Sequence, residues 1–156
     1  VRDLKARWQQ DVTEHNPDWL SIMIGINDVW RQFDLPQMKE LHVGIQEYES
    51  TLNELVEKTL PSLKGLVLMT PYYIEPSKTD AMRTMMDQYG AAVKRTASRV
   101  GAVFVDTQAA FDTVLKSYYP AMLAWDRVHP TAKGVTVISR AFLKAIDFDW
   151  QHETGV

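Results

Sequence analysis

Two short motifs in this sequence carry side chains that could take part in catalysis. The first is G-I-N-D at residues 25–28, and the second is W-D-R-V-H-P at residues 125–130. An aspartate and a histidine three residues apart, as Asp126 and His129 are, can be presented on the same side of one tight turn. The carboxylate then bonds one ring nitrogen and leaves the other free to exchange a proton. The second motif therefore favours acid–base chemistry.

Both motifs also have explanations that involve no catalysis. G-I-N-D can be a plain turn from a strand into a loop, because Gly and Asn tolerate positive φ and Asp28 can bond the local backbone. Asp126 and His129 can form an ion pair that caps a helix. The side chains of Asp28, Asp126 and His129 could also bind a metal by ligand chemistry. No further carboxylate or histidine cluster supports a metal, so we expect no metal and no other cofactor.

Composition places the chain among ordinary folded domains. It has 156 residues, of which 46% are hydrophobic and 24% charged, near the averages for globular proteins. The net charge is −3 and the basic residues are scattered, so we expect no nucleic-acid partner. The longest apolar runs, about five residues, are too short to cross a bilayer, so we expect no membrane partner. The absence of cysteine excludes disulfides and thiolate catalysis and leaves the compartment open.

Helical and strand patterns alternate along the chain. In order they predict a helix (1–15), a buried central strand (19–24), a long irregular loop (26–43), a helix (45–59), a strand (65–70), a helix from a capping box at 77–80 to residue 101, a strand (102–105), and helices after residues 106 and 130. This order predicts an α/β fold of three α/β/α layers around a flavodoxin-like parallel sheet with right-handed crossovers.

Active sites of such folds lie beyond the carboxyl ends of the strands. The loops that start at residues 25, 71 and 106 would converge there. The strand at 19–24 would have a bare edge unless another strand covered it, and the chain starts at Val1 rather than Met. We therefore expect residues 1–156 to be one domain that lacks one or two N-terminal strands.

The two motifs, in this order within an α/β pattern, resemble the third and fifth sequence blocks of the SGNH hydrolases, also called the GDSL esterase and lipase family. The resemblance covers essentially the whole chain. It implies a Ser-His-Asp triad in which Asp126 orients His129 and His129 acts as general base and then acid. It also implies that Asn27 donates to the oxyanion. The implied activity is hydrolysis of short-chain carboxylic or acetyl esters through an acyl-serine intermediate.

The chain departs from the family pattern because it lacks the G-D-S block that supplies the serine and the block with a second oxyanion glycine. Both blocks normally lie upstream. Of the seven serines, only Ser77 falls in a loop on the expected catalytic side, where capping the next helix is its simpler role. We therefore expect this fragment alone to be inactive, and to form a homo-oligomer or associate with a missing N-terminal part. The alternative is a noncatalytic α/β module that binds a ligand or partner.

Aromatic side chains in the same loops could surround a small ester substrate. The candidates for an acyl or sugar pocket are Trp30, Tyr72 and Trp125. Large apolar side chains of this kind fit a hydrophobic core equally well.

Overall fold

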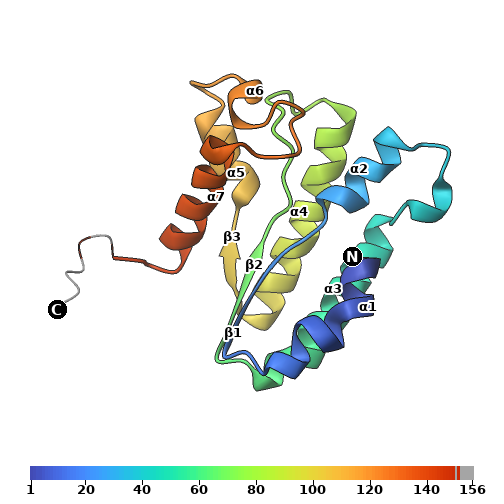
Figure 1. Ribbon diagram of the computed structural model, residues 1–156, viewed down its shortest axis with the longest axis vertical. Helices are drawn as coiled ribbons and strands as arrows, with labels where there is room; N and C mark the ends of the chain where they lie inside the picture. Colours follow the sequence, from blue (N-terminus) through green and yellow to red (C-terminus); the bar gives the residue numbers. More distant parts are fainter. Residues whose placement is uncertain (150, 152–156) are drawn as a thin grey trace.

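The computed structural model describes residues 1–149 and 151 and has the expected α/β architecture (Figure 1). Its sheet is parallel, with the strand order β1-β2-β3 in the described residues. The strands are β1 (Trp19–Met23), β2 (Gly65–Met69) and β3 (Val103–Val105). All of them point toward the same end of the sheet (Figure 1), so the segments that follow them gather there.

Helices cover the sheet from both sides. In Figure 1, α1, α3 and α4 lie on one side, and α5 and α7 lie on the other. The helices are α1 (Arg2–Asp11), α2 (Ile26–Asp34), α3 (Ile45–Thr59), α4 (Ala81–Val100), α5 (Thr107–Val114), α6 (Pro120–Leu123) and α7 (Ala132–Ala145). Single 3-10 turns occupy Thr13–His15, Lys39–Leu41 and Leu60–Ser62. No helix among the described residues is long and apolar enough to span a membrane.

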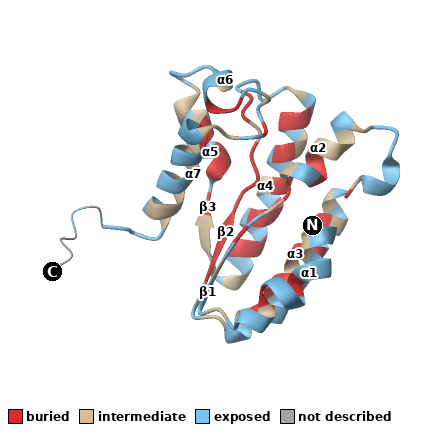
Figure 2. Cartoon of the chain, in the orientation of Figure 1, coloured by how far each residue is buried: buried red, intermediate tan, exposed pale blue. Residues whose placement is uncertain are grey.

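The core is organised by β2, which is buried on both faces. Successive side chains of a strand point to opposite faces, so Leu66 and Leu68 join the cluster with α1, α3 and α4. Val67 and Met69 join a second cluster, against which Phe142 of α7 packs. Figure 2 shows the buried residues concentrated in β2 and along the inner sides of α3 and α4. A continuous apolar run is the sequence pattern that such a strand requires.

The strand predicted at 19–24 is confirmed as β1, but in the described residues it is not buried on both faces. β1 is an edge strand, and only β2 pairs with it among the described residues. Ile22 is 6% exposed, whereas Trp19 is 59% and Met23 42% exposed. The reason is that α7 packs over β2 and β3 and does not bury the corresponding face of β1. Further strands before Val1, and self-association, stay predictions.

The expected loop at 26–43 is also wrong in its first half, which forms α2. Ile26, Val29, Trp30 and Phe33 follow the i, i+3, i+4, i+7 spacing of an amphipathic helix. Val29 is fully buried in the main cluster. This helix places Asn27 in a first helical turn instead of a flexible loop.

Helix caps match the sequence patterns in part. Asp106 caps α5, the helix predicted after this residue, because its side chain accepts a hydrogen bond from the N–H of Ala109 at 2.9 Å. The predicted cap of α4 by Ser77 is wrong: Asp80 caps this helix by accepting from the N–H of Arg83 at 2.9 Å. The N–H of Ser77 instead donates to the side chain of Glu75.

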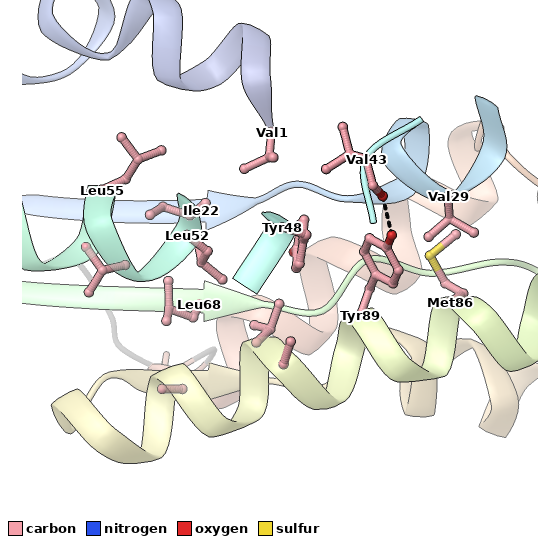
Figure 3. Close-up of a cluster of buried hydrophobic side chains, with 14 of the residues drawn as sticks. Val1, Ile22, Val29, Val43, Tyr48, Leu52, Leu55, Leu68, Met86 and Tyr89 are labelled. Carbon is pink, nitrogen blue, oxygen red and sulfur yellow. Dashed lines mark hydrogen bonds between the residues drawn. The ribbon is translucent and has the colours of Figure 1, made fainter. Parts of the chain in front are cut away.

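A buried hydrogen-bond set fixes the junction between β1 and α2. Gly25 has φ of +125°, and a Cβ there would lie 3.1 Å from both Pro71 and Tyr48, so glycine is required. The Tyr48 hydroxyl donates to the carbonyl of Ile24 at 2.8 Å. Beside it, the Tyr89 hydroxyl donates to the carbonyl of Val43 (Figure 3). The Tyr48 bond therefore ties the junction before α2 to α3, and the Tyr89 bond ties the segment before α3 to α4.

Replacing Leu68 by Ala should destabilise the protein, because this β2 side chain is 1% exposed in the main cluster. We expect the free energy of unfolding to fall by about 2–5 kcal/mol, measured by chemical denaturation. Val135→Ala on the exposed face of α7 is the control, with an expected change within about 0.5 kcal/mol. Equal losses in both variants would contradict the central role of β2.

Candidate active site

Asp126 and His129 form the hydrogen-bonded pair that their spacing predicts. Asp126 Oδ2 lies 2.6 Å from His129 Nδ1. Asp126 Oδ1 accepts hydrogen bonds from the N–H groups of Val128, at 3.0 Å, and of His129, at 2.8 Å. One carboxylate therefore closes the turn and orients the imidazole ring.

The turn is attached directly to α6 and α7. Thr131, two residues after His129, caps α7 by accepting from the N–H of Gly134. The N–H of Thr131 donates to the carbonyl of Leu123 at 2.7 Å. Gly134 permits this approach, because a Cβ there would lie 2.5 Å from the Leu123 carbonyl oxygen. The predicted placement of His129 just before a rigid helix is confirmed.

The pKa of Asp126 is lowered to about 2. Partial burial acts to raise this pKa, but hydrogen bonds from the His129 ring and from the N–H groups of His129 and Val128 outweigh it. Asp126 is therefore ionised at neutral pH. A fixed carboxylate at Nδ1 stabilises the imidazolium that forms when Nε2 takes up a proton.

The other ring nitrogen of His129 is available for proton transfer. The side chain is 62% exposed, and Nε2 has no hydrogen-bond partner among residues 1–149 and 151. The ring of Trp30 contacts the His129 ring edge-on, with centroids 5.4 Å apart and planes at 81°. This contact brings α2 against the Asp126–His129 turn.

Asn27 lies one helical turn before Trp30, at the start of α2. Figure 1 shows this end of α2 and the segment between α6 and α7 at the same end of the sheet. The Asn27 side chain is exposed and forms no hydrogen bond with a described residue. It borders a hollow of about 510 Å³ that it shares with Arg2 and Arg31, and His129 does not line this hollow. The structure thus brings α2 against the turn through Trp30, but no hydrogen bond in the described residues joins Asn27 to the turn.

The structure does not support a metal site at these residues. In the described part of the chain, no group of three His, Asp or Glu side chains could hold a metal ion. Asp28, which we considered as a third ligand, is buried, and Asp126 bonds within its own turn.

The aromatic candidates have different roles. Trp30 contacts His129, and Trp125 is 79% exposed next to Asp126, so both can meet a substrate. The expectation that Tyr72 lines a pocket is wrong, because it is 5% exposed and its ring packs 4.7 Å from that of Phe111. Its hydroxyl points to the Val128 carbonyl at 3.4 Å, so Tyr72 supports the turn from within the core.

One charged residue beside the turn, Glu75, belongs to neither of the two motifs. Glu75 is 6% exposed and forms an ion pair with Arg127. A signal was present in the sequence, since Glu75 stands in the otherwise apolar and aromatic run at residues 72–76. A charged residue in such a run indicates a buried carboxylate with a specific partner.

Comparisons with known proteins agree with this geometry. The model of the GDSL-like lipase/acylhydrolase family matches residues 1–137. The chain belongs to this family. Acetylxylan esterase from Geobacillus stearothermophilus is 61% identical over 150 residues, which cover 96% of this chain and 68% of that protein.

Two solved structures are closely similar. The crystal structure of Axe2, an acetylxylan esterase from Geobacillus stearothermophilus, has a TM-score of 0.94 and 61% identity, covering 96% of this chain and 68% of Axe2. LAE5, an alpha/beta hydrolase enzyme from the metagenome of Lake Arreo, Spain, has a TM-score of 0.93 and 56% identity, covering 94% and 67%. The predicted SGNH-type α/β fold is confirmed.

These relationships make the chain a carboxylic ester hydrolase, and they do not favour a noncatalytic module. Catalytic mutants of Axe2 replace a serine, an aspartate and a histidine. The aspartate and histidine of Axe2 are three residues apart, which is the spacing of Asp126 and His129 here.

The lowered pKa of Asp126 predicts its behaviour in acid. Because the folded pKa of about 2 lies below the ordinary 3.8, ionised Asp126 stabilises the fold above about pH 4, and this contribution is lost as the pH falls through about 2. Carboxyl ¹³C NMR of labelled aspartate should show Asp126 still mostly ionised near pH 3, where a carboxyl with the ordinary pKa of 3.8 is mostly protonated. His129→Ala removes one hydrogen bond and should raise this pKa. An ordinary titration of Asp126 in the unmodified protein would contradict the geometry.

Proposed function

We propose that this protein removes acetyl groups from acetylated xylan oligosaccharides, with Asp126 and His129 as two members of a Ser-His-Asp triad. The observation that carries the proposal is the Asp126–His129 bond, which leaves Nε2 of His129 open to solvent. The 61% identity to an acetylxylan esterase supports the substrate class. Acetate esters of sugars fall within the short-chain esters that the sequence predicts.

In the proposed reaction, His129 Nε2 takes the proton of a serine hydroxyl while the serine oxygen attacks the acetyl carbonyl. The imidazolium then protonates the departing sugar oxygen, which leaves an acetyl-serine. Water repeats the sequence with the same base, releasing acetate and restoring the serine. Asp126 stays ionised throughout and stabilises the positive ring.

We place the nucleophilic serine outside these 156 residues. No serine among the described residues is hydrogen-bonded to the His129 ring. The hydroxyl of Ser77, the serine that the sequence places in a loop on this side, bonds Thr79. In Axe2 the catalytic serine lies far upstream of the catalytic aspartate and histidine, which supports this assignment.

Asn27 is the proposed oxyanion donor. Its amide carries N–H groups with no partner in the described residues, and the first-turn N–H groups of a helix also lack partners within the helix. Preorganised donors of this kind are strongest when negative charge develops on the carbonyl oxygen. Trp125, which is exposed, and the partly buried Trp30, which contacts His129, supply aromatic surface beside the pair for the apolar face of a sugar.

Removing the base should abolish turnover. With the enzyme expressed from its full reading frame, His129→Ala should lower acetate release from acetylated xylo-oligosaccharides by about 10³-fold or more, because no other group takes the serine proton. The matched control is His15→Ala, at an exposed histidine after α1, which should keep normal rates. Near-normal acetate release by folded His129→Ala would overturn the triad.

Asn27→Ala separates an oxyanion donor from a residue that serves only the first turn of α2. A donor predicts a fall in kcat of about 10²–10³-fold with little change in KM, because the bond strengthens as charge develops. The melting temperature should barely change. Measuring kcat and thermal unfolding on one preparation tests this, and a lowered melting temperature with an intact kcat would remove Asn27 from the site.

A further inference from the structure

Glu75 is a buried carboxylate that the proposed reaction does not use. It lies in the segment between β2 and α4 and is 6% exposed. One oxygen accepts a hydrogen bond from the N–H of Ser77 at 2.8 Å, and the other forms the ion pair with Arg127. Burying a carboxylate is costly unless it is paired, so this contact holds Glu75 and Arg127 together.

Arg127 is the second residue of the Asp126–His129 turn. Its φ is +66°, in the left-handed region that few non-glycine residues adopt. Its carbonyl accepts from the N–H of Ile74 at 3.0 Å, while its guanidinium reaches Glu75. The segment after β2 therefore binds Arg127 twice, once through the backbone and once through the side chain.

That segment is itself anchored in the helices. Arg83 of α4, only 2% exposed, donates to the carbonyl of Glu75 at 2.7 Å and pairs with Asp112 of α5 at 2.8 Å. Gln108 of α5 accepts from the N–H of Tyr73 at 2.8 Å. The backbone around Glu75 is thus held by buried hydrogen bonds from α4 and α5.

The bonds made by Asp126 are internal to the turn. They fix the imidazole relative to the carboxylate, but they do not fix the turn relative to Asn27 and the substrate. We propose that Glu75 is a positioning residue, which holds the Asp126–His129 turn in its catalytic place through Arg127. This inference rests on the proposed role of His129 as general base.

The proposal predicts a loss of kcat without a loss of substrate binding. Glu75 is too buried to touch a substrate, so Glu75→Gln should leave KM nearly unchanged. A small displacement of a catalytic base costs up to about 10²-fold in rate, and we expect kcat to fall by about 10- to 100-fold. Arg127→Asn should do the same, because asparagine tolerates the left-handed backbone and lacks the cation.

Three further variants test whether Glu75 acts through Arg127. Arg127→Lys keeps the charge and should retain most of the kcat. The double variant Glu75→Gln/Arg127→Asn should lose no more than the worse single variant, because both remove one ion pair. Arg95→Asn is the matched control: it removes an exposed ion pair with Glu49 between α3 and α4 and should leave kcat unchanged.

A readout independent of turnover separates this inference from the proposed function. The proton between His129 Nδ1 and Asp126 should give a downfield ¹H NMR signal, which Glu75→Gln and Arg127→Asn should broaden or shift and Arg95→Asn should not. If His129→Ala retained activity, the proposed function would fail, and this signal would still report on the turn. An unchanged signal and kcat in folded Arg127→Asn, or additive losses in the double variant, would overturn the positioning role.

Discussion

Burial of β2 on both faces is the constraint on which the remaining structure depends. A strand with apolar side chains on both sides needs a helical layer on each, and α3 with α4 on one face and α7 on the other supply these layers. The same strand ends in the segment that carries Tyr72 and Glu75. β2 thereby leads directly into the segment that contacts the Asp126–His129 turn.

The site combines a local interaction with several distant ones. The bond between Asp126 and His129 spans three residues and would form in many contexts. In the structure, Trp30 of α2 contacts the imidazole ring, and Arg127 inside the turn forms an ion pair with Glu75. A surface turn therefore gains a defined position from buried partners in other elements.

The charged side chains in the turn and those buried beneath it are stabilised in different ways. Asp126 keeps enough hydrogen bonds to stay ionised, with its pKa lowered to about 2, and so it is suited to stabilise a transient imidazolium. Glu75 and Arg83 lie deeper and are paired within the protein. Family membership and 61% identity to an acetylxylan esterase agree with a site built for ester hydrolysis.

The sequence by itself determined the α/β fold, the ester hydrolase family and the Asp126–His129 pair, because strand patterns, helix caps and short motifs are local. Tertiary structure alone decided which side chains of β1 are exposed, since exposure depends on where α7 packs. It likewise decided that Tyr72 is buried and that Glu75 meets Arg127, a contact between residues 52 positions apart. The missed helix α2 is a separate case, because its spacing was present in the sequence and only its packing through Val29 made that spacing plain.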